Sequence, residues 1–310
     1  MIRPPALRPG DRVALICPAG PVGEEKIQIA DARCRALGFE PVPGRSIRSR
    51  AGYLAGTDRE RADDLAGAIA GDVAAIWAIR GGYGTLRTLQ LVDLAPLVRN
   101  PRAFIGFSDN TAIQLALHKL GVVSFHGPHA GHPHFPAATE ATFRSVLGRS
   151  EAAGVLPVGV EVDAPPVTLV GGAAQGPLVG GNLALLAAAC GTPYQPDTRG
   201  AILFVEDIAE PLYRIDRMIT QLRLAGLLDD IAGIAFGEFT EMPAPVLRGE
   251  PGAEPCLEEV LRELIAPLGV PAVLGLPFGH GRENWTLPLG VAARLDADHA
   301  TLELLEPAVR

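Results

Sequence analysis

The sequence has few cysteines, few aromatic residues and no cluster of basic residues among its 310 positions. The four cysteines, Cys17, Cys34, Cys190 and Cys256, lie far apart and form no C-x-x-C pair, so we expect buried thiols in a reducing compartment. The formal net charge is −8, and without a basic cluster a nucleic-acid backbone is not an expected partner. Nucleic-acid binding is therefore the first class of function that the composition argues against.

Long apolar runs are also missing. No apolar stretch reaches membrane-spanning length without an interrupting polar residue, glycine or proline. Near the N-terminus, the apolar run at residues 13–17 is too short for the central region of a signal peptide, and Pro18 follows it. We therefore expect no membrane partner and a location in the cytoplasm.

The chain does have abundant aliphatic residues in a repeating pattern. Hydrophobic residues make up 48% and aromatic residues 5% of the chain, so its cores are expected to consist mainly of Ala, Val, Leu and Ile. In the first half, apolar segments alternate with amphipathic ones, which is typical of an α/β fold with a parallel sheet, Rossmann-like or flavodoxin-like. The predicted strands are 12–17, 39–42, 73–79 and 103–107, and the predicted helices are 24–37, 59–70, 85–91 and 110–120.

The composition changes between residues 151 and 169, where valine, glycine, proline and alanine dominate without a helical period. We interpret this stretch as a linker. It divides the chain into an N-terminal α/β domain, 1–150, and a smaller mixed α/β domain, 170–310. In the second domain the sequence predicts helices at 183–190, 212–224 and 257–265, and strands at 201–205, 272–274, 291–295 and 301–305.

Ser108 stands where a predicted strand passes into a predicted helix. At such a turn a hydroxyl can be exposed beside the free amides of the first helical turn. Those amides and the helix dipole favour negative charge, which suits a serine nucleophile whose attack creates an oxyanion. The G-x-S-x-G motif of α/β-hydrolases is incomplete, because Asn110 occupies the second glycine position. The alternative is that Ser108 or Asp109 is only the N-cap of the helix.

A serine nucleophile needs a base, and the base needs an orienting carboxylate. His280 is the candidate base, because it lies between two glycines on a loop that follows a predicted strand. The candidate carboxylates are Glu206 and Asp207, at the end of the predicted strand 201–205. The alternatives are an ordinary loop histidine and a carboxylate that caps the following turn.

Several separated motifs, taken in order, resemble the LD-carboxypeptidase family, the serine peptidases also called muramoyltetrapeptide carboxypeptidases. The motifs are RGGYG at 80–84, GFSD at 106–109, HGP at 126–128, GGNL at 180–183, VED at 205–207 with EPLYRIDR at 210–217, GLPFGHG at 275–281 and TLPLG at 286–290. The resemblance extends over the whole chain.

This resemblance implies a Ser–Glu–His triad, with Ser108 as nucleophile, His280 as base and Glu206 as its orienting carboxylate. It implies an oxyanion hole built from the backbone N–H groups of Asp109 and Gly82, where glycine has no side chain to block a substrate oxygen. The implied reaction is hydrolysis of the bond between the L-centre of a diamino acid and terminal D-Ala of murein tetrapeptides, in cell-wall recycling. The resemblance also implies an active site between the two domains and a homodimer.

Four histidines crowd into one short segment; they are His126, His129, His132 and His134. Imidazoles this dense can bind zinc, but the intervening glycines and prolines fix no helix face and the spacing matches no standard site. The family needs no metal, and we expect no cofactor. We interpret the segment as a loop near the mouth of the active site.

An exopeptidase must also recognise a free carboxylate. Arg80, Arg214 and Arg217 are candidates, because a guanidinium binds a carboxylate through two parallel hydrogen bonds. Arg214 and Arg217 are expected on the exposed side of a helix, which is the purely structural interpretation. Trp285, soon after His280, fits either a pocket wall or the edge of a core.

Other functions fit the sequence less well. Some relatives in the same family cleave peptide–nucleotide antibiotics and confer self-immunity, with the same triad and different loops around the pocket. A two-domain protein that holds a peptide without catalysis is a second alternative, and the presence of all three triad residues argues against it. Dinucleotide binding has little support, because residues 17–21 do not form G-x-G-x-x-G.

Overall fold

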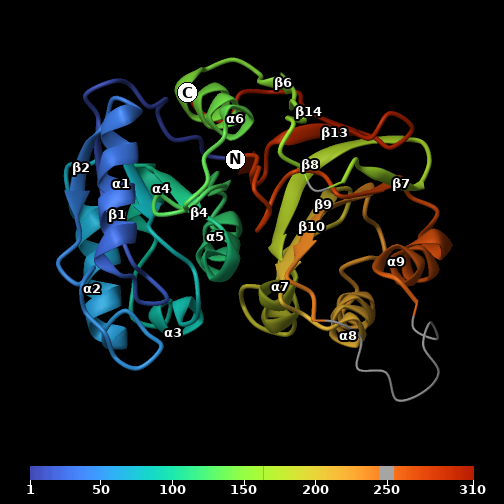
Figure 1. Ribbon diagram of the computed structural model, residues 1–310, viewed down its shortest axis with the longest axis horizontal. Helices are drawn as coiled ribbons and strands as arrows, with labels where there is room; N and C mark the ends of the chain where they lie inside the picture. Colours follow the sequence, from blue (N-terminus) through green and yellow to red (C-terminus); the bar gives the residue numbers. More distant parts are fainter. Residues whose placement is uncertain (163, 244–254) are drawn as a thin grey trace.

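The computed structural model describes residues 1–162, 164–243 and 255–310. Two sheets stand side by side, one of six strands and one of eight, with helices packed around them (Figure 1). The two ends of the chain lie close together, because the backbone N–H of Ala6 donates to the carbonyl of Arg310 and that of Arg310 donates to Pro4.

The six-stranded sheet is formed mostly by the first half of the chain. Its order is β12-β5-β4-β3-β1-β2, and every neighbouring pair is parallel except β12 with β5. The strands are β1 (Arg12–Ile16), β2 (Glu40–Pro43), β3 (Ala75–Ala78), β4 (Ala103–Gly106), β5 (Phe125–His126) and β12 (Leu287–Pro288). The antiparallel edge strand β12 comes from the far end of the sequence.

Helices cover both faces of this sheet, as the continuous apolar strands predict. Along β1, Val13 and Leu15 point into one buried cluster and Ala14 and Ile16 into another, because successive side chains leave a strand on opposite faces. The first cluster includes residues of α1 (Glu24–Ala36) and α6 (Ala137–Gly148). The second includes residues of α2 (Asp58–Ala70), α4 (Pro96–Arg99) and α5 (Thr111–Lys119), and the short α3 (Thr85–Thr88) contacts α2 and α5.

The eight-stranded sheet has a parallel centre and antiparallel ends, in the order β6-β14-β13-β8-β9-β10-β11-β7. Its strands are β6 (Gly154–Val155), β7 (Val167–Val170), β8 (Ala173–Asn182), β9 (Ile202–Ile208), β10 (Gly233–Thr240), β11 (Ala272–Leu274), β13 (Ala292–Asp296) and β14 (Thr301–Leu304). One face packs against α7 (Leu183–Ala189), α8 (Leu212–Leu224) and α9 (Leu257–Ile265), which the turn η2 (Ala266–Leu268) follows.

The other face of the eight-stranded sheet shares a core with the six-stranded sheet. One buried cluster includes Trp77 of β3, Phe204 of β9 and Leu295 of β13. Trp285 is fully buried in this cluster, and its indole N–H donates to the carbonyl of Pro157 at 2.7 Å. Of its two possible roles, Trp285 therefore has the core one.

The fold class is confirmed: the chain is α/β, with a parallel sheet in the N-terminal region and a second, mixed sheet. The strand expected at 201–205 is wrong at its end, because pairing with β10 continues through Ile208 and places Glu206 and Asp207 inside β9. The helix expected at 85–91 ends at Thr88, whose hydroxyl lies 3.3 Å from the carbonyl of Pro18 and 3.2 Å from that of Gly84. The sequence interpretation missed α4, α6, β5, β8 and β10.

The stretch expected to be an irregular linker contributes to the second sheet. Within it, β6 pairs with β14 and β7 pairs with β11. In addition, β12 joins the first sheet although it lies in the segment assigned to the second domain. The division at residues 1–150, 151–169 and 170–310 stays a prediction. Among the described residues, no helix has both the length and the apolarity needed to cross a membrane.

Candidate active site

The turn after β4 holds Ser108 in a left-handed backbone conformation. Its φ is 60°, which a residue with a side chain adopts at a cost of about 1–2 kcal/mol. The short helix η1 (Ser108–Asn110) starts at this residue and leads into α5, and the N-cap positions of η1 and α5 are taken by Phe107 and Asn110. The N-cap interpretation of Ser108 is therefore wrong, because Ser108 is the first residue of η1 and not its cap.

Asp109 caps a neighbouring helix rather than its own. Its Oδ2 accepts a hydrogen bond of 2.9 Å from the backbone N–H of Thr85, the first residue of α3. Its carbonyl accepts a second one, of 2.5 Å, from the Thr85 hydroxyl. These two bonds fix the turn that carries Ser108 against the loop that follows β3.

The loop after β3 approaches Ser108 through Gly81. A β-carbon on Gly81 would meet the β-carbon of Ser108, whereas one on Gly82 would meet the backbone of Gly20 at 3.0 Å. The φ of 119° and the nearness of Gly20 are a second reason for glycine at position 82, and the expected one, free approach of a substrate oxygen, stays a prediction. Gly82 is exposed, and its N–H has no acceptor within the described part of the chain.

Glu206 and His280 meet although they come from different parts of the chain. Nδ1 of His280 lies 2.6 Å from Oε2 of Glu206, in a charge-assisted hydrogen bond. Glu206 is fully buried on β9, and the His280 side chain is 13% exposed. Gly279 makes this contact possible, because a β-carbon there would lie 2.6 Å from Glu206 Oε2.

The pKa values of this pair move in opposite directions. Burial alone would raise the pKa of Glu206, but the charge of His280 and its hydrogen bond hold that pKa below its ordinary value. Burial alone would lower the pKa of His280, but the charge of Glu206 and the same hydrogen bond raise it above its ordinary value. When Nδ1–H donates to the carboxylate, Nε2 of the neutral imidazole is left as a proton acceptor.

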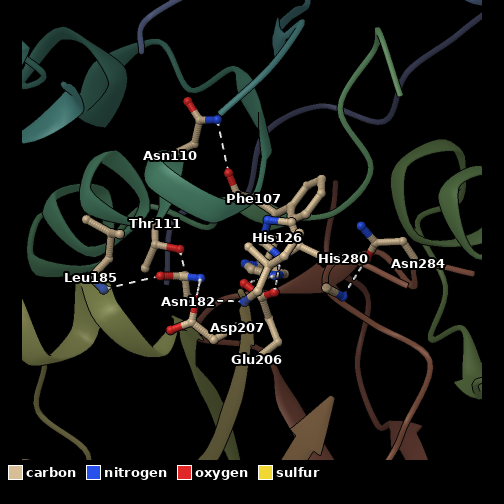
Figure 2. Close-up of polar contacts among 12 residues, drawn as sticks. Phe107, Asn110, Thr111, His126, Asn182, Leu185, Glu206, Asp207, His280 and Asn284 are labelled. Carbon is tan, nitrogen blue, oxygen red and sulfur yellow. Dashed lines mark hydrogen bonds and ion pairs between the residues drawn. The ribbon is translucent and has the colours of Figure 1, made fainter. Parts of the chain in front are cut away.

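Phe107 joins this pair to the serine turn. Its ring packs edge-on against His280, with ring centroids 4.7 Å apart, and edge-on against His126 at 5.9 Å. Figure 2 shows Phe107, His126 and His280 gathered around the carboxylate of Glu206. Since Ser108 follows Phe107 directly, the turn that holds the serine is packed against the histidine.

Asp207, the other candidate carboxylate, does not bond to a histidine. Its Oδ1 accepts from the side-chain amide of Asn182 at 2.8 Å, and its Oδ2 accepts from the backbone N–H of Ala184 at 2.9 Å in the first turn of α7. The backbone N–H of Asn182 donates to the hydroxyl of Thr111 at 3.1 Å (Figure 2). Asp207 therefore caps α7, which precedes it in the chain, and not the turn that follows it, and the hydrogen bonds of Asn182 connect β9 to the helix that follows Ser108.

The histidine-rich segment is not a surface loop throughout. His126 lies on β5 and is fully buried, and His129 is buried and stacks on Phe107 with ring centroids 4.1 Å apart. His132 is partly exposed and His134 is exposed. Within the described ranges, no group of three or more histidine, cysteine or acidic side chains is arranged to hold a metal ion.

The three candidate arginines lie outside this cluster. Arg80 is exposed, and its guanidinium donates to the carbonyl of Pro21 at 2.9 Å. Arg214 is 53% exposed and lies 3.5 Å from Glu210, and Arg217 lies over the ring of Tyr213. The expected exposure of Arg214 and Arg217 on their helix is confirmed.

Sequence reasoning did not single out Gly81, Asn182 or the role of His126 in the interior. Each belongs to a quoted motif: RGGYG, GGNL and HGP. The motifs marked these positions, but the partner of each residue became visible only with the two sheets in place.

The geometry suits chemistry by a nucleophilic side chain. An imidazole oriented by a buried carboxylate beside a strained turn with a partly exposed serine is the arrangement used for acyl transfer through a covalent intermediate. Two models of known domains match the chain: the LD-carboxypeptidase N-terminal domain over residues 13–127, and the LD-carboxypeptidase C-terminal domain over residues 175–295. The chain belongs to the LD-carboxypeptidase family.

Individual relatives agree with this LD-carboxypeptidase assignment. The chain is 37% identical over 305 residues to a probable murein peptide carboxypeptidase of Bacillus subtilis, covering 96% of this chain and 93% of the relative. It is 33% identical over 296 residues to the murein tetrapeptide carboxypeptidase of Pseudomonas aeruginosa, covering 93% and 94% of the two chains.

Solved structures give the same result. The muramoyltetrapeptide carboxypeptidase of Oxalobacter formigenes superimposes with a TM-score of 0.80 at 34% identity, over 94% of this chain and 97% of that chain. The structure of MccF in complex with glutamyl sulfamoyl guanosine has a TM-score of 0.89 at 23% identity over both whole chains, which shows a shared fold. This LD-carboxypeptidase is therefore a hydrolase of the serine carboxypeptidase type.

Proposed function

We propose that this LD-carboxypeptidase hydrolyses the bond between the L-centre of a diamino acid and terminal D-Ala in murein tetrapeptides, in the recycling of the cell wall. The observation that carries the proposal is the 2.6 Å hydrogen bond between Glu206 and His280, packed against the turn that holds Ser108. The murein peptide substrates of two relatives support the choice of substrate.

The first half of the reaction forms an acyl-enzyme. Ser108 Oγ attacks the carbonyl carbon while Nε2 of His280 takes the hydroxyl proton, and Glu206 stabilises the resulting imidazolium. The backbone N–H groups of Asp109 and Gly82 stabilise the oxyanion. His280 then gives its proton to the nitrogen of the departing D-Ala, and the carbon–nitrogen bond breaks.

The second half regenerates the serine. Water attacks the acyl carbon, His280 accepts a proton from that water, and the tetrahedral intermediate collapses with return of the proton to Ser108 Oγ. The products are D-Ala and a tripeptide with a free carboxylate. No metal or other cofactor takes part in this scheme.

Mass spectrometry of a murein tetrapeptide incubated with the protein tests the proposal. We expect wild type and the matched control Ser145→Ala to release one D-Ala in the presence of EDTA, and Ser108→Ala to release none. Ser145 is a suitable control, because its hydroxyl donates to the carbonyl of Thr142 within α6. Equal cleavage by wild type and Ser108→Ala would reject Ser108 as the nucleophile.

The alternative substrate is a peptide–nucleotide antibiotic. A relative named microcin C7 self-immunity protein MccF, from Escherichia coli, is 26% identical over 298 residues. If wild type leaves the tetrapeptide intact and cleaves an aminoacyl sulfamoyl nucleoside, the substrate assignment moves to this class with the same three residues.

Assembly, which rests on the family resemblance, and location are further parts of the proposal. We infer a homodimer, which light scattering of the purified protein would test by its molar mass. We also infer a cytoplasmic location, which cell fractionation with an antibody against the protein would test.

A further inference from the structure

Glu206 faces a histidine at each of its two carboxylate oxygens. Oε2 lies 2.6 Å from Nδ1 of His280, and Oε1 lies 3.8 Å from Nε2 of His126. The two histidines approach from different sheets, because His126 is part of β5 and His280 follows β11 (Figure 2). The second histidine is not needed for the proton transfers described above.

His126 and Glu206 both have buried polar atoms without a hydrogen-bond partner. Both side chains are fully buried. Within the described part of the chain, both ring nitrogens of His126 lack a hydrogen-bond partner, and so does Oε1 of Glu206. An imidazole always carries at least one N–H, and a buried N–H without an acceptor costs about 1–3 kcal/mol of stability. The side-chain amide of Asn182 also lies close enough to lower the pKa of Glu206, but it donates to Asp207 at 2.8 Å. Oε1 of Glu206 therefore lacks a donor and His126 lacks an acceptor.

The surroundings leave His126 few other choices. The rings of Phe107 and Phe204 pack edge-on against its imidazole, with centroids 5.9 and 5.3 Å away. Neither phenylalanine can accept an N–H as a carboxylate does. Burial lowers the pKa of His126 to about 4 despite the opposing charge of Glu206. The ring is therefore a neutral donor at physiological pH and adds no second positive charge.

The backbone position of His126 connects this contact to the nucleophile. His126 pairs in parallel register with Gly106, two residues before Ser108. Glu206 belongs to the other sheet, where it pairs with Asn182. A bond from His126 to Glu206 would therefore fix the carboxylate relative to the strand that leads to the serine.

We propose that His126 is a positioning residue whose Nε2–H donates to Oε1 of Glu206 and keeps Oε2 directed at His280. A shortening of the 3.8 Å separation by less than 1 Å completes the hydrogen bond. The inference rests on the proposed function for its kinetic consequences, but the bond itself does not depend on any substrate.

Nuclear magnetic resonance of wild-type protein labelled with ¹⁵N-histidine tests the bond directly. We expect His126 to be the tautomer with its proton on Nε2, with a proton resonance shifted downfield by the carboxylate. The variant His126→Gln identifies the signal by its loss. A tautomer protonated on Nδ1, or a charged ring at neutral pH, would overturn the proposal even if the substrate assignment failed.

Steady-state kinetics of two variants at position 126 test the effect of this hydrogen bond on catalysis. In His126→Phe an aromatic ring still fills the space, but the Nε2–H donor is lost, so we expect kcat to fall on the order of 10²-fold with KM within twofold. In His126→Gln an amide N–H takes the place of Nε2–H, so most of kcat should return. Similar kcat values in the two variants, with similar melting temperatures, would reduce His126 to a packing residue.

Discussion

A β-carbon on Gly81 would lie 2.9 Å from the β-carbon of Ser108 and 3.1 Å from its hydroxyl oxygen. The φ of Gly81 is not in the left-handed region, so its backbone can accept a larger residue. The glycine is therefore required by the nearness of the serine rather than by its own conformation. Position 81 thus offers a way to disturb the nucleophile from a neighbouring loop.

Gly81→Ala is expected to lower kcat/KM at least about 10²-fold, because the added methyl group displaces the serine hydroxyl by a fraction of an ångström. Gly67→Ala is the matched control, since a β-carbon at this helical position meets nothing within 4 Å. Steady-state kinetics of both variants, with melting temperatures, make the comparison. Full activity of Gly81→Ala would show that the loop has room to move away.

Glu206→Gln removes the charge that raises the pKa of His280. Burial is then opposed only by the weaker effects of the Asp207 and Glu241 charges, so the pKa of His280 falls and the acid limb of kcat/KM against pH should move to lower pH. We also expect kcat to fall about 10³–10⁴-fold, because the imidazolium loses its counter-charge. Profiles measured from pH 5 to 9 test both effects. If the acid limb keeps its wild-type position, that limb reports the titration of a group other than His280.

The raised pKa of Asp207 should make the free energy of unfolding depend on pH. Burial and the charge of Glu206 raise its pKa to about 6 from an ordinary value of 3.8. The folded state therefore binds this proton more tightly than the unfolded state. The contribution to stability is present below about pH 4 and is lost as the pH rises through 6, and its size is on the order of 3 kcal/mol.

Urea unfolding of wild type and Asp207→Asn at pH 4, 5, 6 and 7 measures this term. The asparagine cannot titrate, so the free energy of unfolding of wild type relative to the variant should decrease between pH 4 and 6 and then level off. A difference that is the same at every pH would place the pKa of Asp207 near its ordinary value.

Arg61 joins the loops that border the serine turn. Its guanidinium is fully buried and donates to the carbonyls of Pro18 and Gly84 at 3.0 and 2.9 Å. Arg61→Met removes this donor from the two carbonyls and from Asp58, which keep Thr88 and Arg87 as partners, so we expect a loss of about 1–3 kcal/mol. Chemical denaturation measures it.

The control for this prediction is Arg59→Met in the same helix. Arg59 pairs with Asp63 at 3.0 Å, but its side chain is 73% exposed. We expect a change within about 0.5 kcal/mol, because exposed ion pairs contribute little. Equal losses of unfolding free energy in the two variants would mean that the buried hydrogen bonds of Arg61 do not stabilise the fold.

Local pattern predicted many of the elements in both halves of the chain. The strand β11 (Ala272–Leu274) and the helix α8 (Leu212–Leu224) coincide with the predicted segments, because periodicity and bounding residues depend on near neighbours in the chain. Errors occurred where partners far away decide the outcome. Pairing with β10 prolongs β9 beyond residue 205, and no local signal shows that pairing.

For the candidate site, the residue types and the serine turn could be predicted, and the contacts could not. Ser108 between a buried strand and a helix is a local feature, and the family motifs marked Glu206 and His280. Choosing between Glu206 and Asp207 by physics needed the structure. The two side chains leave β9 on opposite faces, and only Glu206 points toward the histidines.

The sequence by itself determined the alternation of strands and helices, the turn at Ser108 and the membership of the LD-carboxypeptidase family, because these depend on short-range pattern and on motifs in order. The tertiary structure decided which groups meet. Glu206 and His280 are 74 residues apart, and their contact depends on strand register and on the shared core between the sheets. Such contacts have no local signature, since each depends on the packing of the whole chain.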